Sequence, residues 1–435
     1  MIGEGIDIRM DIHSCITQRQ CNKTEYFDRI WVLHFYTIPA KVLSKGDNQM
    51  SDPIPYYQCI IPPYMLRNIV ENGTPQQKGR ALESLSISGQ FRGQRQAHTE
   101  MPKFGPPAAA GPAVKQRIIY DAGFGTTLPG VKVREEGAPP SSDVAVNEAY
   151  DGSGYTFDLF LDAYQRNSID GNGLRLDSTV HYGKGYDNAF WNGKQMVYGD
   201  GDEDIPADQR LFNRFTISID VIGHELSHGV TQYEAALAYQ GQPGALNESK
   251  SDVFGSLVKQ KSLNQTAQEA DWIIGAGLFT SRVNGVGIRS MKAPGTAYDD
   301  PVLGKDPQPA HMKDYVSTYE DNGGVHINSG IPNRAFYIAA TEIGGYAWEK
   351  AGRIWYVTLR DKLSSSSNFI AAAQATYQAA GELYGEGSAE QKAVEKGWNT
   401  VGIQIGSGTS DNQGCLAAPV TMIKSLFKPK EAAKK

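Results

Sequence analysis

The 435-residue chain is poor in cysteine. Its four cysteines are Cys15, Cys21, Cys59 and Cys415, so none lies between residues 60 and 414. A disulfide framework is therefore excluded from this long segment, and so are a thiolate metal site and a cysteine nucleophile.

The chain also lacks an excess of positive charge and a long apolar run. Its 42 Lys and Arg against 48 Asp and Glu give a formal net charge of −6, so no basic surface is expected to bind nucleic acid. The apolar stretch RIWVLHFYTIPAKVL (30–44) is too short to span a bilayer. The opening MIGEGIDIRMDIHSC has no basic start followed by an apolar run, so we expect no signal peptide.

The residues that are present suffice for a sizeable core, since 40% are hydrophobic and 10% aromatic. The hydrophobic period changes along the chain from β-like to helical near Ile217. This change predicts an α+β protein of two lobes, with a cleft where they meet. The predicted segments are a poorly ordered N-terminal extension (1–57), a short N-terminal segment and a Pro, Gly and Ala-rich linker (58–116), a β-rich lobe (117–218), a central helix (219–236), a mainly α-helical lobe (237–404) and a C-terminal tail (405–435).

Two finer expectations concern helices outside the C-terminal lobe. The stretch LRNIVENGTPQQKGRALESL (66–85) has helical spacing that is interrupted at Asn72-Gly73. Within the β-rich lobe, YTFDLFLDAYQRN (155–167) predicts one helix.

The central helix carries two histidines four residues apart in GHELSHGVTQ (223–232). On a helix this spacing lets His224 and His228 point at one metal ion, and Glu225 can reach a water on that ion. Alternatively, the histidines are ordinary helix residues, because this pattern arises by accident in roughly one such protein in a hundred. A third ligand is needed to decide.

The third ligand is not at the short spacing HExxHxxGxxH, because Thr231 and Glu234 occupy the positions of its glycine and last histidine. The next candidate is Glu248 in GALNESKSD (244–252), on a second predicted helix. Asp252 follows one turn later on the same face, where it can accept the remaining N–H of a ligand histidine. Taken alone both would be solvent-facing charges, but with the histidines they favour a zinc site.

At this point the chain resembles the thermolysin-like metallopeptidases, and their protealysin-like branch most closely. The resemblance extends over residues 60 to about 404. It rests on NAFWNGKQMVYGDGD (188–202), HELSHGVTQY (224–233), GALNESKSD (244–252), IRSM (288–291) and DNGGVHINSG (321–330), in the order of the family. It implies a two-lobed fold joined by the central zinc-binding helix.

The resemblance implies one catalytic zinc, held by His224, His228 and Glu248. Glu225 would take a proton from the attacking water and pass it to the leaving amine. The remaining catalytic roles fall to Tyr239 and His326 as donors to the oxyanion, and to Asp321, which would orient the His326 imidazole.

For substrate binding, the resemblance implies that Asn188 and Ala189 bond the main chain of an extended peptide and that Arg289 holds one of its carbonyls. An apolar specificity pocket would then lead to cleavage on the amino side of large hydrophobic residues. Its lining residues would be Phe212, Val221, Leu278 and Ile288, for which ordinary core packing is the alternative.

The N-terminal segment IPPYMLRNIVENG (61–73) resembles the short pro-segment of protealysin-like precursors. In that case Pro62, Pro63 and Tyr64 act as an intramolecular inhibitor, and the segment is cut away between about residues 90 and 115. The alternative is that these three residues form only a polyproline turn.

The chain departs from secreted thermolysin-type members at the positions that hold two calcium ions there. Those positions here are Asp220, Lys259, Asp271, Ile273 and Ala276. Two carboxylates and a lysine cannot supply the six or more oxygens that calcium needs, so no double-calcium site is expected. Together with the lack of a signal peptide, this predicts a cytoplasmic protein; secretion by a route independent of a signal peptide is the alternative.

The leading hypothesis is therefore a zinc-dependent neutral endopeptidase, made as a latent precursor, monomeric, and acting on peptides or proteins. A catalytically inactive, zinc-stabilised peptide-binding protein is the alternative, although binding alone needs none of Glu225, Tyr239 and His326. A zinc aminopeptidase is a third reading, but the sequence offers no evident site for a free amino terminus.

Overall fold

The computed structural model describes residues 58–96 and 113–405. The predictions for residues 1–57, for the tail after residue 405 and for most of the linker lie outside the described residues. The strands are β1 (Gln58–Cys59), β2 (Arg117–Asp121), β3 (Val131–Glu135), β4 (Leu176–Val180), β5 (Ala189–Trp191), β6 (Met196–Tyr198), β7 (Ile273–Ile274), β8 (Arg289–Ser290), β9 (Asp299–Asp300) and β10 (Gly304–Lys305). The helices are α2 (Pro63–Asn72), α3 (Pro75–Gln96), α4 (Val144–Tyr164), α5 (Ile219–Tyr233), α6 (Gly241–Ser262), α7 (Asp321–Asn328), α8 (Gly330–Ile343), α9 (Ala351–Asp361), α10 (Phe369–Tyr384) and α11 (Ala389–Thr400), with 3₁₀ turns η1 (Ala207–Gln209), η2 (Phe215–Ile217) and η3 (Met312–Asp314).

One six-stranded sheet organises the β-rich part, in the order β1-β5-β6-β4-β2-β3. The strands β2, β4 and β6 run parallel, and β5 returns antiparallel to β6. The strand β1, from the N-terminal segment, adds antiparallel to β5, with Cys59 opposite Phe190. All residues of β5 and β6 are buried, so this side of the sheet lies deep in the protein.

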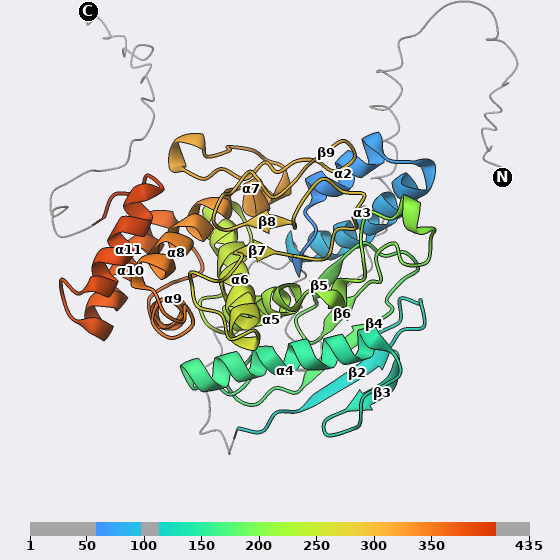
Figure 1. The fold of residues 1–435 in the computed structure, drawn as a ribbon, viewed down its shortest axis with the longest axis horizontal. Helices are drawn as coiled ribbons and strands as arrows, with labels where there is room; N and C mark the ends of the chain where they lie inside the picture. The colour runs from blue at the N-terminus through green and yellow to red at the C-terminus, as the bar shows by residue number, and fades with distance from the viewer. Residues whose placement is uncertain (1–57, 97–112, 406–435) are drawn as a thin grey trace, which may run out of the picture. The chain divides into compact units, whose positions relative to one another are not determined.

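The helices α5 and α6 lie between this sheet and the C-terminal helices α8 to α11 (Figure 1). The long helix α4 packs against β2 and β4 and against α5 and α6, while α8 to α11 pack together in the C-terminal part. A single large apolar cluster runs through both parts of the chain. Among the described helices, none has the length and hydropathy needed to cross a membrane.

The break expected in the N-terminal segment lies where the sequence places it, because α2 ends at Asn72 and α3 begins at Pro75. Both helices are tied to the rest of the protein by side-chain amides. Asn68 donates to the Leu303 carbonyl at 2.8 Å, and Gln77 donates to the Gln209 carbonyl at 2.8 Å. The N-terminal segment is thus packed onto the protein through polar contacts as well as through its apolar face.

The predicted helix at 155–167 is too short at its start, since α4 begins at Val144. Asp143 caps the longer helix by accepting hydrogen bonds from the backbone of Ala145 and Val146. Gly152 would normally weaken a helix interior. Here a Cβ at Gly152 would lie 2.4 Å from the Ile222 side chain, so the glycine permits close packing of α4 on α5.

Asp143 also belongs to a charged cluster that ties the start of α4 to the sheet. The His181 imidazole bonds Asp143 through Nε2 and Asp200 through Nδ1, both at 2.8 Å. The hydrogen bond that His181 donates to Asp200, and then the charges of both carboxylates, raise the pKa of His181 to about 9 despite partial burial. The imidazolium therefore joins the helix N-terminus to the ends of β4 and β6.

Replacing His181 by Gln should lower the free energy of unfolding by about 2 kcal/mol below pH 6.5, after allowance for solvent screening. Because the folded pKa of His181 is raised above 6.5, its contribution is complete below that pH and is lost as the pH rises through about 9. Denaturant titrations at several pH values measure this, with His311→Gln, at the residue that precedes η3 and has no carboxylate partner among the described ion pairs, as control. A difference between wild type and His181→Gln that stays constant to about pH 10 would contradict the assignment.

Candidate metal centre and substrate cleft

The helices α5 and α6 cross very closely, and this crossing positions the predicted metal ligands. A Cβ at Gly255 on α6 would lie 2.4 Å from the Asp220 carbonyl and 2.9 Å from the His224 nitrogen. Only glycine allows the two backbones to approach this far. The approach brings Glu248, two turns earlier on α6, against the histidines of α5.

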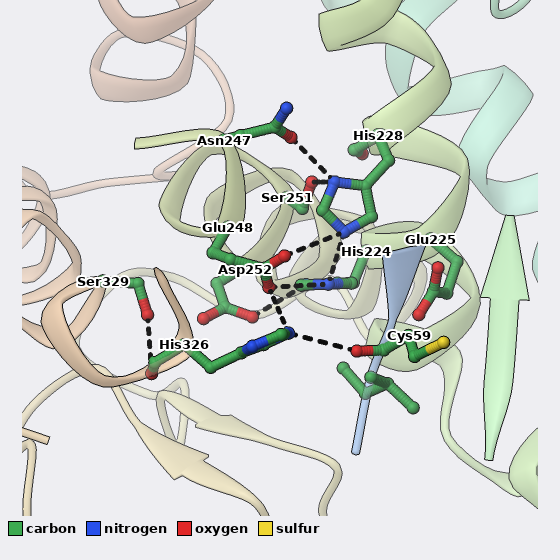
Figure 2. Close-up of polar contacts among 12 residues, drawn as sticks. Cys59, His224, Glu225, His228, Asn247, Glu248, Ser251, Asp252, His326 and Ser329 are labelled. Atoms are coloured by element: carbon green, nitrogen blue, oxygen red, sulfur yellow. Dashed lines mark hydrogen bonds and ion pairs between the residues drawn. The ribbon is translucent and has the colours of Figure 1, made fainter. Parts of the chain in front are cut away.

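His224, His228 and Glu248 form a fully buried group with ligand atoms within 4.8 Å of one another. The two Nε2 atoms are 3.0 Å apart. The Glu248 carboxylate lies 3.5 Å from Nε2 of His224 and 3.6 Å from Nε2 of His228. Figure 2 shows the three side chains converging.

The donor set fits a metal ion because of how each imidazole is held on its far side. His224 Nδ1 bonds the Asp252 carboxylate at 2.8 Å, and His228 Nδ1 bonds the Asn247 amide oxygen at 2.8 Å. These acceptors place the ring hydrogen on Nδ1, so both Nε2 lone pairs face each other. The buried Glu248 Oε2 accepts no hydrogen bond in the described structure, so the donor set fits a metal cation.

Asp252 is the centre of a second layer of contacts. It pairs with the Arg289 guanidinium through two bonds of 2.8 Å and accepts another from Asn333 at 2.8 Å. Burial alone would raise the pKa of Asp252, but Arg289 and His224 hold it well below its usual range. The carboxylate is therefore a fixed negative charge behind His224, where sequence analysis expected it.

Sequence analysis missed three residues of this layer. Asn247 and Ser251 both bond His228 Nδ1, and they flank Glu248 and Asp252 on α6. Ser251 lies four residues after Asn247, as Asp252 lies four after Glu248, and this parallel helical spacing was a usable signal. Asn333 lies on α8, and nothing local in the sequence connects it to Asp252.

Glu225 lies next to the ligand set and is held by the backbone of β5. Its Oε2 accepts a hydrogen bond of 3.0 Å from the Trp191 backbone N–H, and the side chain is buried. Figure 2 shows it on the side where Cys59 enters the cleft. This placement beside both the metal ligands and the strand suits a proton-transferring group.

The predicted oxyanion donors lie on the other side of the ligands. His326 Nδ1 bonds Asp321 at 2.6 Å, and its Nε2 lies 3.2 Å from the Tyr239 hydroxyl. Burial would lower the pKa of His326, but Asp321 and Glu248 outweigh it and raise that pKa. The Tyr239 hydroxyl itself donates to Glu248 in this structure.

The cleft between these groups holds the chain's own N-terminal segment. The Cys59 carbonyl lies 3.2 Å from His326 Nε2, as Figure 2 shows, and Arg289 donates to the Ile60 carbonyl at 3.2 Å. The Ile60 N–H donates to the Ala189 carbonyl at 3.3 Å, and the Ile61 N–H donates to the Asn188 side chain at 3.0 Å. Residues 59–61 thus use every group predicted to bind a substrate main chain.

The residues assigned to block the cleft were Pro62, Pro63 and Tyr64, and this assignment needs a correction. The contacts with the predicted site residues come instead from Cys59, Ile60 and Ile61, which immediately precede Pro62 in the sequence. Pro62 and Pro63 are buried where the chain turns into α2, which begins at Pro63. A strand can pair with β5 until proline ends the ladder, so the blocking residues are those before the prolines.

The predicted specificity residues are all fully buried, and they belong to the same apolar cluster as Ile60 and Ile61. They come from the loop after β6, from α5 and from the segment before β8. They are Phe212, Val221, Leu278 and Ile288.

A buried site with two histidines and one carboxylate, beside a strand that holds a peptide in the substrate position, defines a metallopeptidase in its precursor form. Three family sequence models match the chain. The thermolysin metallopeptidase catalytic domain matches residues 127–232, its alpha-helical domain matches 235–403, and the protealysin propeptide matches 58–86. The chain belongs to the thermolysin metallopeptidase family, in its protealysin-like branch.

Individual relatives are similar to this chain over most of their own length. The "Extracellular metalloprotease" of Pectobacterium carotovorum subsp. carotovorum is 51% identical, over 80% of this chain and 96% of the relative. "Protease PrtS" of Photorhabdus sp. is 48% identical, over 80% of this chain and 93% of the relative. The solved precursor of protealysin from Serratia proteamaculans is 55% identical, with a TM-score of 0.70 over 80% of this chain and 99% of that one. The protein is a zinc metalloendopeptidase made as a precursor with an inhibitory pro-segment.

Changing Asp252 to Asn should weaken zinc binding about 10- to 100-fold, because His224 loses the carboxylate that sets its tautomer. Competition with a chromophoric chelator measures the affinity. Asp162→Asn is the matched control, since that exposed carboxylate pairs with Lys261 far from the ligands. Equal zinc affinity in wild type and Asp252→Asn would contradict the role of Asp252.

Proposed function

We propose that the protein hydrolyses peptide bonds with zinc held by His224, His228 and Glu248 and with Glu225 as the general base. Bound there, zinc supplies a Lewis acid that polarises the scissile carbonyl and acidifies the attacking water. Glu225 then accepts the proton of that water and delivers it to the leaving amine. The hydrogen bond from the Trp191 N–H supports this role, since it fixes the carboxylate beside the substrate strand.

His326 is proposed to donate to the oxygen of the scissile carbonyl as negative charge develops on it. The position of the Cys59 carbonyl, 3.2 Å from His326 Nε2, supports this role. Asp321 keeps the imidazole oriented through Nδ1, and its charge favours the protonated, donating form. Tyr239 is the proposed second donor, and its hydroxyl is already within 3.2 Å of His326 Nε2.

Substrates are proposed to bind as an extra strand on β5, with Asn188, Ala189 and Arg289 holding their main chain. The observation that carries this proposal is the register of the pro-segment. The Cys59–Ile60 peptide bond lies between the His326 and Arg289 contacts, where a scissile bond would lie. Ile60, on its carboxyl side, supports cleavage on the amino side of large hydrophobic residues, in a pocket formed by Phe212, Val221, Leu278 and Ile288.

Glu225→Ala should lower kcat/KM for a peptide with an internal Leu or Phe by about 10²–10⁴-fold, because the attacking water loses its base. Zinc content should stay unchanged, since Glu225 is not a ligand. Hydrolysis is followed by chromatography after removal of the pro-segment, and mass spectrometry locates the cut.

Two outcomes of this assay would favour other functions. Equal activity in wild type and Glu225→Ala would contradict the mechanism, and an absence of cleavage by both, with zinc bound, would favour a peptide-binding protein. Cleavage that disappears when the substrate's amino terminus is blocked would favour an aminopeptidase.

We propose further that the protein has no double-calcium site, because the Lys259 ammonium occupies the position that a calcium ion would take. The Lys259 ammonium lies 2.7 Å from Asp220, 2.9 Å from Asp271 and 2.6 Å from the Ile273 carbonyl. Burial would lower the pKa of Lys259, but Asp220 and then Asp271 raise it, so the group carries its positive charge. These are the oxygens that a calcium ion would need.

Lys259→Met should lower the free energy of unfolding by about 3–5 kcal/mol, since it leaves the buried Asp220 charge without its partner. Lys261→Met, two residues along α6 and paired with an exposed aspartate, is the matched control with little expected effect. A calcium chelator should not change the melting temperature of the wild type. A large loss of stability on calcium removal would contradict the proposal.

A monomer acting on peptides or proteins in the cytoplasm is the form we propose, with secretion independent of a signal peptide as the alternative. Stability without calcium, supported by Lys259, fits a compartment with little free calcium. Fractionation of the source cells decides between the two locations, and gel filtration with light scattering reports the oligomeric state.

A further inference from the structure

The acidic stretch GDGDED (199–204) follows β6 and takes no part in the catalysis described above. Two of its carboxylates, Asp202 and Asp204, lie beside Asp187, which immediately precedes the substrate-binding residue Asn188. We call Asp187, Asp202 and Asp204 the acidic pocket. Asp202 and Asp187 are buried, whereas the Asp204 side chain is one-third exposed.

One arginine of the pro-segment fills this pocket. Arg80 on α3 donates to Asp204 at 2.6 Å and to Asp202 at 3.4 Å, and also to the Gly201 carbonyl at 3.2 Å. Its guanidinium lies against the bare backbone of Gly185, where a Cβ would come within 2.3 Å of Nη1. The guanidinium therefore lies between the carboxyl groups and the backbone of Gly185.

The pocket also holds a buried carboxyl group that Arg80 leaves without a hydrogen bond. Asp187 is only 2% exposed, and within the described structure its Oδ1 has no hydrogen-bond partner. Burial and then the charge of Asp202 raise the pKa of Asp187, and only Arg80 among its charged neighbours opposes this. When α3 leaves, Asp202, Asp204 and the Gly201 carbonyl lose the guanidinium that now donates to them, and another basic side chain can restore those hydrogen bonds.

The pocket also adjoins the cleft on the side where the carboxyl-terminal part of a substrate lies. Asp202 accepts hydrogen bonds from the backbone of Leu211 and Phe212, and Phe212 is a predicted specificity residue. The pairing of Cys59 with Phe190 continues to Ile61 beside Asn188, so the next residue of an extended peptide would lie opposite Asp187. That residue is the third after the bond in the scissile position.

We propose that the acidic pocket is a binding site for a basic side chain, filled by Arg80 in the precursor and by an arginine or lysine of the substrate after the pro-segment leaves. The site thus anchors the pro-segment first and selects substrates afterwards. The second half of the proposal rests on the peptidase function proposed above, whereas the first half does not.

Hydrogen exchange of the intact precursor tests the first half without any need for catalysis. In a Glu225→Ala background, Arg80→Gln should speed hydrogen exchange of the α3 amides by about 10- to 100-fold. The reason is that α3 opens more readily once it loses a charge-assisted hydrogen bond to the carboxyl groups. Arg67→Gln is the matched control, because that arginine of the pro-segment pairs with the exposed Glu320. Unchanged exchange in Arg80→Gln would overturn the proposal. If that variant misfolds, Asp204→Asn tests the same contact from the exposed side of the pocket.

Two matched peptides test the second half with the processed enzyme. They differ only in Arg or Gln at the third residue after an internal Leu–Ile bond, which is the expected site of cleavage. The Arg peptide should have a kcat/KM about tenfold higher, and Asp204→Asn should bring the ratio of the two toward one. Equal cleavage of both peptides by the wild type would overturn substrate selection by the pocket. Cleavage of neither would instead contradict the peptidase function, and the exchange experiment would still decide the role of Arg80.

Discussion

The close crossing of α5 and α6 is the constraint on which the rest of the site depends. Gly255 lets the helix backbones meet, and the crossing then forces His224, His228 and Glu248 into one buried space. Asp252 and Asn247 hold both imidazole rings with their lone pairs turned inward. Such a cluster is unfavourable by itself, because two imidazole lone pairs and a carboxylate face one another away from water. A bound dication relieves this, so the fold and the metal are coupled energetically.

The pro-segment pairs with β5, the strand proposed to receive a substrate, and this pairing explains latency. The pro-segment takes the hydrogen bonds of Asn188, Ala189, Arg289 and His326, and its helices add contacts outside the cleft at Asn68 and Arg80. The metal ligands already have their second layer of contacts in the precursor. Removal of the segment therefore only has to clear the cleft, and the strength of inhibition is divided between the strand and its distant anchors.

Sequence reasoning succeeded where the geometry is local. The four-residue spacings of His224 with His228 and of Glu248 with Asp252 place each pair on one helix face without reference to the rest of the fold. It failed where packing overrides local preference. The first turns of α4 were missed because Gly152 normally disfavours a helix, and its contact with Ile222 could not be foreseen. Asn333 and the strand at Cys59 were missed for a different reason, because their partners are far away in the sequence and leave no local pattern.

The central claim is that a single zinc ion is bound by two histidines and a carboxylate in the intact precursor. X-ray absorption at the zinc edge tests it most directly on the purified full chain. Two imidazole nitrogens at about 2.0–2.1 Å and oxygen ligands at about 2.0–2.2 Å are expected around the zinc, with no sulfur. A sulfur neighbour at about 2.3 Å, which would bring Cys59 onto the metal, or a protein that binds no zinc, would contradict it.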